Sequence, residues 1–121
     1  MAASAGWCPE RGDVIWIDCN PQAGREMKNV HPFLVLSPKN FNASTSLVIG
    51  LPMTTSQSNE NNPFAVKFIG ADGVTSYILT HQPKSYDWKA RDAKPHKMKR
   101  VPEASFELSC ESLNQIIAIG S

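Results

Sequence analysis

The feature that most constrains the fold of this chain is a series of short apolar runs, each followed by a proline. The runs span residues 13–18, 32–37 and 46–51, and the prolines that follow them are Pro21, Pro38 and Pro52. All three runs are rich in β-branched or aliphatic side chains, and each is too short for a buried helix. Proline also lacks the N–H that would continue a sheet ladder. These runs therefore predict three short β-strands separated by turns.

Weaker signals extend the same pattern along the chain. Residues 64–68 and 74–80 are predicted to form a hairpin, because the tight-turn pair Asp72-Gly73 lies between them. A short edge strand is expected at residues 98–101. Between the second and third apolar runs, a helical turn is expected around Asn40.

The last part of the chain has a helical period. Pro102 suits the first position of a helix, and apolar residues then follow at spacings of four, three and four before Gly120. They are Phe106, Cys110, Leu113 and Ile117. Many short strands and one terminal helix indicate a mostly β protein, a small antiparallel barrel or half-barrel with a C-terminal α-helix. We expect residues 1–10 to be a flexible N-terminus and residues 11–121 to be one domain.

Composition limits the class of protein. A chain of 121 residues with 41% hydrophobic residues can bury one compact core. Three cysteines without C-x-x-C spacing favour reduced thiols over a disulfide framework or a zinc site. The sequence shows neither a signal-peptide pattern nor an apolar run of about 18 residues. We therefore expect a cytoplasmic protein with no membrane partner.

Positive charge gathers in one segment, although the formal net charge of the chain is only +1. Residues 84–100 contain seven Lys or Arg and two Asp, so the segment carries +5 before its histidine is counted. Lys and Arg beside phosphates release counterions, and Tyr86 and Trp88 offer rings that stack on unpaired bases. An acidic protein partner and an ordinary solvated loop fit the same charge. Composition alone leaves these three alternatives open.

Several catalytic motifs are missing. The sequence has no G-x-x-x-x-G-K-S/T or G-x-G-x-x-G phosphate loop, no G-x-S-x-G nucleophile elbow and no histidine pair at helix-face spacing. Nucleotide hydrolysis, dinucleotide redox chemistry and metal catalysis therefore have no support. We expect no metal and no cofactor.

Two polar loops carry the remaining chemistry. The loop at residues 22–31 contains Arg25, Glu26, Lys28 and His31, and the loop at residues 54–62 begins with Thr54, Thr55, Ser56 and Gln57. Such groups support RNA transesterification: a base takes the 2′-hydroxyl proton, cations or hydroxyls stabilise the phosphorane, and an acid protonates the leaving 5′-oxygen. Taken singly, each residue is more commonly structural or a solvated surface group. Their combination favours the catalytic interpretation.

The order of the sequence blocks resembles the MazF/PemK toxins of bacterial type II toxin-antitoxin modules. The first blocks are Arg11-Gly12-Asp13-Val14-Ile15-Trp16-Ile17-Asp18, Asn20-Pro21-x-x-Gly24-x-Glu26, His31-Pro32-Phe33-Leu34-Val35-Leu36-Ser37-Pro38 and Leu51-Pro52-Met53-Thr54-Thr55. Asp72-Gly73-Val74, His81-Gln82-Pro83-Lys84-Ser85 and Trp88-Lys89-Ala90-Arg91 follow in the same order. The similarity extends from about Arg11 to Gly120, nearly the whole chain.

This resemblance implies an SH3-like barrel of the CcdB/PemK/MazF type with a C-terminal helix, usually a homodimer. It implies a metal-independent endoribonuclease that cuts single-stranded RNA, in particular mRNA, at specific sequences and so stops translation. The products would carry a 2′,3′-cyclic phosphate and a 5′-hydroxyl. A cognate antitoxin, a small acidic protein encoded nearby, would silence the enzyme by laying a disordered segment into its RNA-binding groove.

Carried over residue by residue, the resemblance assigns Glu26 as the general base and Thr54 as a contact to the scissile phosphate. His31 departs from the family, because the MazF pattern has an Arg before this Pro. Imidazole donates a proton near neutral pH more readily than guanidinium, but it cannot clamp a phosphate with two bonds. We therefore expect His31 to be the acid, with Arg25 supplying the lost cation.

Further polar residues of the matched blocks and loops are predicted to bind RNA. They are Lys28, Thr55, Ser56, Gln57, Gln82, Lys84, Trp88 and Arg91. The PemK branch uses an Arg and an Asp before a Gln-Pro pair, but Leu79 and His81 occupy those places here. Because His31 stands where the MazF pattern has an Arg, a second function stays open. The alternative is a non-catalytic binding module, either a CcdB-like gyrase poison or a cleavage-dead binder of an antitoxin.

Overall fold

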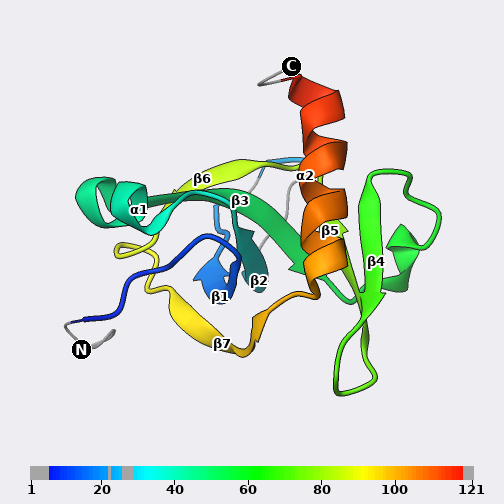
Figure 1. Ribbon diagram of the computed structural model, residues 1–121, viewed down its shortest axis with the longest axis horizontal. Helices are drawn as coiled ribbons and strands as arrows, with labels where there is room; N and C mark the ends of the chain where they lie inside the picture. The colour runs from blue at the N-terminus through cyan, green and yellow to red at the C-terminus, as the bar shows by residue number, and fades with distance from the viewer. Residues whose placement is uncertain (1–5, 22, 26–28, 119–121) are drawn as a thin grey trace.

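The computed structural model describes residues 6–21, 23–25 and 29–118. In these ranges short β-strands are followed by one long helix (Figure 1). The strands are β1 (Asp13–Asp18), β2 (Val30–Val35), β3 (Leu47–Thr54), β4 (Ala65–Ile69), β5 (Thr75–Leu79), β6 (Lys84–Asp87) and β7 (Lys94–Arg100). The helices are α1 (Lys39–Thr45), the short 3-10 helix η1 (Gln57–Asn59) and α2 (Glu103–Ile117). The prediction of a mostly β chain with a C-terminal helix is confirmed.

Strand β3 lies at the centre of a curled antiparallel sheet with the order β4-β5-β3-β2-β1-β7. One edge of β3 pairs with β2. On its other edge, the first half of β3 pairs with β6 and its last two residues pair with β5. One long strand thus serves two neighbours in turn, and the sheet bends where the partner changes (Figure 1). The predicted antiparallel half-barrel is confirmed.

Gly50 permits the close approach that this bend requires. A Cβ atom at Gly50 would lie 2.0 Å from the backbone oxygen of Leu34 and 2.7 Å from the Phe33 ring. No side chain fits into that space, so any larger residue would push β3 away from β2. Glycine is therefore required near the point where β3 exchanges β6 for β5.

Neighbouring residues of one strand enter two different hydrophobic clusters. Val14 and Leu34 lie in one cluster, while Ile15 and Phe33, the next residue on each strand, lie in the other. Helix α2 packs against the first of these clusters with Phe106 and Leu113. Since both faces of β1 and β2 are buried, their apolar runs are nearly continuous rather than alternating. Full burial of each such side chain contributes about 1.5–3 kcal/mol.

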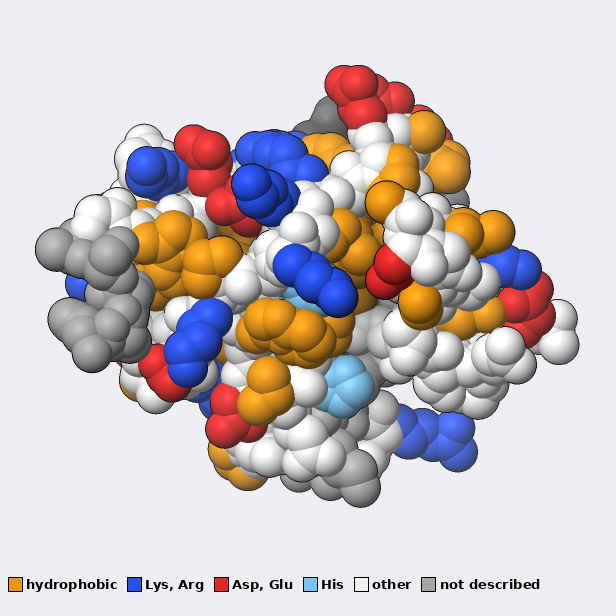
Figure 2. All heavy atoms as spheres, turned by 90° about the horizontal axis from the view of Figure 1, so that it is seen from below, with side chains coloured by type: hydrophobic (Ala, Val, Ile, Leu, Met, Phe, Trp, Pro, Cys, Tyr) orange, Lys and Arg blue, Asp and Glu red, His pale blue; other side chains and the backbone are white. Residues whose placement is uncertain are grey.

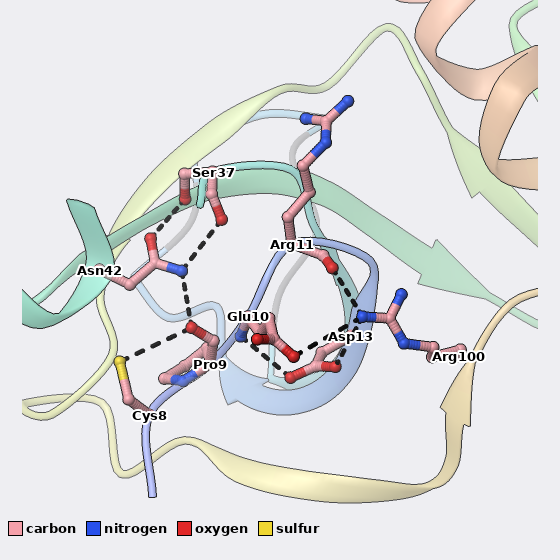
Figure 3. A network of polar contacts seen from close by, with 8 residues as sticks. All are labelled: Cys8, Pro9, Glu10, Arg11, Asp13, Ser37, Asn42 and Arg100. Atoms are coloured by element: carbon pink, nitrogen blue, oxygen red, sulfur yellow. Dashed lines mark hydrogen bonds and ion pairs between the residues drawn. The ribbon is translucent and has the colours of Figure 1, made fainter. Parts of the chain in front are cut away.

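A buried asparagine connects α1 to the segment before β1 (Figure 3). The Asn42 side chain is inaccessible to solvent and donates from Nδ2 to the backbone oxygens of Pro9 at 2.9 Å and Ser37 at 3.1 Å. Its Oδ1 accepts the Ser37 hydroxyl. All the polar atoms of this amide therefore have partners, as burial requires.

Two residues just before β1 are packed. The Trp7 ring meets the Trp88 ring edge-on at 5.6 Å, and Pro9 is buried. Trp88 itself donates its indole N–H to the backbone oxygen of Asn42 at 2.9 Å. A flexible N-terminus stays a prediction, and within its bounds Trp7 and Pro9 are packed against the domain. The small side chains and charged residues around them hid the packing of Trp7.

Arg100 closes the seam between β1 and β7. Its guanidinium donates to the Arg11 backbone oxygen at 2.9 Å and lies 3.8 Å from the Asp13 carboxylate (Figure 3). Gly12 has a φ of +94°, and a Cβ atom there would lie 2.2 Å from Arg100 Nη1. Glycine therefore leaves the room that the guanidinium occupies. Burial raises the pKa of Asp13, against the lowering effects of the Glu10 backbone N–H and of Arg100. Arg100, one of the cations of the predicted basic segment, thus makes contacts within the protein itself.

Several strand boundaries differ from the prediction. β3 runs from Leu47 through Pro52 to Thr54 rather than over residues 46–51, so Thr54 ends a strand and does not begin the predicted loop. β6 was not predicted, because its sequence is polar and belongs to the basic segment; it forms because four residues of β3 pair with it. β7 begins at Lys94 rather than at residue 98. β2 begins at Val30, so His31 lies in a strand and not in the predicted loop. No helix in the described ranges is long and apolar enough to span a membrane.

Replacing the buried asparagine tests the connection between α1 and the segment before β1. Asn42→Ala should lower the free energy of unfolding by about 1–3 kcal/mol, because it leaves the Pro9 and Ser37 oxygens without their donor. Ser44→Ala, on the exposed side of the same helix, should change it by less than about 0.5 kcal/mol. Urea denaturation of both variants gives the comparison, and equal losses would contradict the role of Asn42.

Candidate functional site

His31 and Thr54 lie at neighbouring ends of two paired strands. β2 and β3 pair with Phe33 opposite Pro52, and His31 and Thr54 are each two residues beyond that pair, in the same direction along the sheet. Side chains two residues apart share a face of a strand. The imidazole and the hydroxyl therefore project from the same face at the same end of the sheet. The structure brings together two of the predicted catalytic side chains.

The Thr54 hydroxyl takes part in a local turn. Thr54 is only 9% exposed, and its Oγ1 accepts the Ser56 N–H at 3.1 Å. The Ser56 and Ser58 hydroxyls lie 2.9 Å apart, and η1 follows. Thr55, Ser56 and Gln57 are exposed to solvent. The loop after β3 is thus folded onto itself, with its predicted RNA-binding side chains facing outward.

A carboxylate that the sequence analysis missed binds the cross-strand partner of Thr54. Tyr77 of β5 is the direct cross-strand partner of Thr54, and its hydroxyl donates to Glu60 Oε1 at 2.6 Å. Lys67 of β4 pairs with Tyr77 and donates to Glu60 Oε2 at 2.7 Å. The hydrogen bonds from Lys67 and then Tyr77 lower the pKa of Glu60. The hydrogen bond to Glu60 raises the pKa of Tyr77. In sequence, the one signal was a single acidic residue within a neutral loop.

The loop between β1 and β2 is closed at its base by two asparagines. Asn20 donates from Nδ2 to Asn29 Oδ1 at 3.2 Å, and its Oδ1 accepts the Asn29 N–H at 3.0 Å. The Cys19 N–H donates to the Asn29 backbone oxygen at 2.8 Å. Asn29 has φ +67°, a left-handed conformation that asparagine tolerates better than most residues. These bonds bring the two ends of the loop together directly next to His31.

Three further residues of the predicted site belong to this loop, and the structure describes one of them. Arg25 is described and exposed. Glu26 and Lys28 lie outside the described residues, so the general base and one predicted RNA contact stay predictions from the resemblance. The described geometry therefore concerns the acid and the hydroxyl of the predicted site, but not its base.

Arg91 supports the same loop from outside. Its guanidinium donates to the Asp18 backbone oxygen at 2.7 Å and also to the Asn20 backbone oxygen. The same group stacks on the Tyr86 ring, with its central carbon 4.4 Å from the ring centroid. Both bonds use Nη1, and through them Arg91 positions the end of β1. RNA binding by Arg91 stays a prediction.

The aromatic residues of the basic segment belong to the core. Trp88 is 4% exposed and Tyr86 is 8% exposed, and both pack in the cluster that contains Phe33. Buried rings cannot stack on bases, so the RNA-binding role predicted for Trp88, and the stacking suggested for Tyr86, are wrong. The sequence pattern misled because an aromatic between cations looks the same whether its strand faces solvent or the core.

Gln82 and Lys84 lie where the chain passes from β5 to β6. The side-chain oxygen of Gln82 is buried and has no hydrogen-bond donor among the described residues, while the Gln82 N–H donates to the Leu79 oxygen at 3.2 Å. A buried oxygen of this kind costs about 1–3 kcal/mol unless a donor reaches it. Because this oxygen is closed to solvent, RNA binding by Gln82 stays a prediction. Lys84 begins β6, opposite Gly50. His81 stacks on Phe64 at 5.5 Å.

The cations of the basic segment spread over the face that β7 crosses. In Figure 2, which shows the molecule from below, Lys and Arg side chains lie around a central hydrophobic patch. The exposed cations of β7 are Lys94, Lys97, Lys99 and Arg100. Lys94 pairs with Asp92 at 3.0 Å, and Arg100 lies beside Asp13. The second half of the basic segment is thus the strand β7, whose charge is partly neutralised, rather than a free basic loop.

His96 adds no charge to this strand at neutral pH. Burial, followed by the nearby Lys97, lowers the pKa of its imidazole, against a smaller raising effect of Asp72. Its Nδ1 accepts the Met98 N–H at 3.0 Å, and its ring lies 4.5 Å from the ring of Trp16. The bond accepted by Nδ1 requires this nitrogen to be unprotonated, which fits a neutral ring.

The cysteines and acidic residues offer little to a metal. Cys8, Cys19 and Cys110 are free thiols, and burial raises the pKa of Cys8 and of Cys19. Within the residues that the structure describes, no three His, Cys, Asp or Glu side chains are grouped so that they could hold a metal ion.

Solved structures with this architecture are MazF toxins. MazF from Deinococcus radiodurans superposes with a TM-score of 0.83 at 28% identity, over 93% of this chain and 99% of that one. In the MazE-MazF complex of the same organism, the matching chain has a TM-score of 0.78 at 28% identity, with 94% and 99% covered. The half-barrel with its strand-end site and C-terminal helix thus places this chain in the class of MazF-like toxins.

Sequence relatives specify the family. The family model described as "PemK-like, MazF-like toxin of type II toxin-antitoxin system" matches residues 10–117. The endoribonuclease toxin MazF of Escherichia coli is 38% identical over 89 residues, 72% of this chain and 76% of its own length. The endoribonuclease PemK of Escherichia coli is 33% identical over 96 residues, 78% of this chain and 71% of its own. This chain belongs to the PemK-like, MazF-like toxin family, and the predicted resemblance is confirmed.

The role of Arg91 can be tested against a neighbouring cation. Arg91→Met should lower the free energy of unfolding by about 1–3 kcal/mol, because bonds from a charged donor to two backbone oxygens are lost. Lys89→Met removes the same charge from an exposed position and should cost less than about 0.5 kcal/mol. Denaturant titration measures both, and a stable Arg91 variant would argue against the support described above.

Proposed function

We propose that this chain is an endoribonuclease toxin that cuts single-stranded RNA at specific sequences. The observation that carries the proposal is the placement of His31 and Thr54 at neighbouring strand ends on one face of the sheet. Relatives from Escherichia coli that share the family are named endoribonucleases. Cutting of mRNA in the cytoplasm would stop translation and growth, which suits a toxin.

The proposed chemistry is a transesterification within the RNA strand. Glu26 takes the proton of the 2′-hydroxyl, and the 2′-oxygen attacks the adjacent phosphorus. The bond from phosphorus to the 5′-oxygen breaks as His31 donates a proton to that oxygen. Thr54 donates a hydrogen bond to a non-bridging oxygen, and Arg25 offsets its developing negative charge. The products are a 2′,3′-cyclic phosphate and a 5′-hydroxyl, and no step requires a metal or another cofactor.

The exposed polar groups around this site supply the contacts to RNA. Thr55, Ser56 and Gln57 face solvent directly after Thr54. Gln82 and Lys84, which lie where the chain passes from β5 to β6, are proposed as further contacts from the resemblance. Lys28 is proposed as a contact from the resemblance alone. Sequence preference would arise from these loops, because loops carry variable side chains on a rigid scaffold.

Two protein partners follow from the proposed function. MazF chains of Deinococcus radiodurans have been solved as MazE-MazF complexes. We infer a cognate antitoxin for this chain, a small acidic protein whose charge complements β7. A second copy of the chain is the other proposed partner. Exposed Leu108, Ile116 and Ile117 on α2 offer it an apolar surface.

The activity is tested with purified protein and total RNA in the presence of EDTA. Discrete fragments are expected, and a substrate with one 2′-deoxy nucleotide at the cut position should stay intact because the nucleophile is missing. Sequencing the 5′ ends of the fragments identifies the cut motif. Intact RNA together with arrest of growing cells would instead support the non-catalytic binding module. Cleavage of the 2′-deoxy substrate would rule out the proposed attack.

The role of His31 is tested by the pH dependence of the cleavage rate. The rate should fall as pH rises from about 5 to 9, because a neutral imidazole cannot donate the proton. His31→Arg should flatten this profile, since guanidinium keeps its proton. His81→Gln serves as the control and should keep the slope. A flat profile for the unmodified protein would favour Arg25 over His31.

A further inference from the structure

We propose that Glu60 is a positioning residue that holds the loop after β3 in place and thereby orients Thr54 and its neighbours toward RNA. This inference rests on the proposed endoribonuclease function. It assigns to Glu60 no contact with the reacting atoms. Its effect would pass through two bonds, one to Tyr77 and one to Lys67.

Thr54 and the two residues that bind Glu60 form one row across the sheet. Thr54 of β3 pairs with Tyr77 of β5, and Tyr77 pairs with Lys67 of β4. Directly paired side chains lie on the same face, about 4.5–5.5 Å apart at their Cβ atoms. Tyr77 therefore lies beside Thr54, and Lys67 lies beyond Tyr77, on the face from which the Thr54 hydroxyl projects.

Glu60 spans this row from the loop. Oε1 accepts the Tyr77 hydroxyl at 2.6 Å, and Oε2 accepts the Lys67 ammonium at 2.7 Å. The loop is thus tied at both ends. At its start, the Ser56 N–H donates to Thr54 Oγ1, and towards its end, Glu60 reaches back to the neighbours of Thr54. The segment between these ties carries the exposed Thr55, Ser56 and Gln57.

The same geometry argues against Glu60 as a catalyst. Both of its carboxylate oxygens already have donors, and these donors lower its pKa, so Glu60 is a weaker base than an ordinary glutamate. Tyr77 is 1% exposed, and its hydroxyl is directed to Glu60. Neither group is available to take a ribose proton. Their arrangement suits the fixing of a loop.

The effect should appear in catalysis and not in global stability. The Lys67 and Glu60 side chains are each 49% exposed, and exposed ion pairs contribute little to folding. A misplacement of about 1 Å in an active site, by contrast, can reduce a rate about 100-fold. Loss of these bonds should therefore change where the loop lies more than whether the protein folds.

The experiment uses two conservative substitutions and one matched control. Glu60→Gln removes the charge, and Tyr77→Phe removes only the hydroxyl. Both should lower kcat/KM for a short RNA substrate roughly 10- to 100-fold and broaden the set of cut sequences. The control is Asp92→Asn, because Lys94 and Asp92 form a similar exposed pair at 3.0 Å on β7. It should leave kcat/KM and the cut sequences unchanged. Urea midpoints should be similar for all three variants.

A double-mutant comparison tests whether the effect passes through Thr54. In a Thr54→Ala background, Glu60→Gln should cause little further loss, since the group that it positions has been removed. The double variant Glu60→Gln with Tyr77→Phe should have a kcat/KM no lower than that of the less active single variant. Hydrogen exchange of the Ser56 amide should become faster in both single variants, independently of any activity.

The outcomes separate this inference from the proposed function. RNA cleavage that proceeds at the unmodified rate in Glu60→Gln and Tyr77→Phe would overturn the role of Glu60 and leave the proposed function standing. Fully additive losses with Thr54→Ala would also overturn it. Absence of cleavage by the unmodified protein would overturn the proposed function and this inference together.

Discussion

The close contact between Gly50 and the backbone of Leu34 determines the shape of the sheet. Because no side chain separates the two strands at this point, β3 bends and exchanges β6 for β5 along one edge. That exchange sets the direction in which the far end of β3 points. Thr54 is at this end, next to the start of β2 on one side and to β5 on the other. The backbone contact therefore places the site, although it lies several residues away from it.

The two loops at the site are held by different means. The loop before β2 is closed by backbone and amide bonds between Asn20 and Asn29, and Arg91 supports its first end. The loop after β3 is held by the Thr54 hydroxyl and by a carboxylate. Neutral amide bonds do not titrate, whereas the carboxylate bonds depend on ionisation. The proposed base would thus belong to a loop closed by uncharged groups, and the phosphate contact to a loop that charge holds in place.

Much of the fold could be predicted from the sequence because its strands are short and apolar, and prolines follow β1 and β2. Pro52, by contrast, lies within β3. β1 was predicted with its observed bounds, and α2 was predicted from the spacing of its apolar residues. β6 could not be predicted, because a polar strand forms only where a partner strand offers free backbone groups. Asn42 is completely buried within a polar helix, and nothing in its local sequence separates it from the exposed Asn40.

The candidate site shows the same limits. His31 and Thr54 were predicted together because family blocks and strand ends coincide there, and the register of β2 and β3 brings them to one place. Trp88 was misassigned, and the backbone bonds of Arg91 were not foreseen, because a basic, aromatic sequence does not reveal which groups the fold itself uses. Glu60 was missed because its partners, Tyr77 and Lys67, lie on other strands. Local pattern identifies groups with reactive chemistry, but the partners that restrain them become visible only in three dimensions.

The amide bonds between Asn20 and Asn29 have an evolutionary consequence. Both bonds are made by Asn20 and Asn29, which flank the enclosed segment, so they stay in place when a side chain between them is replaced. A duplicated copy of this gene could therefore diverge in target preference at enclosed positions other than Glu26, the proposed base, and still keep the loop closed at its base.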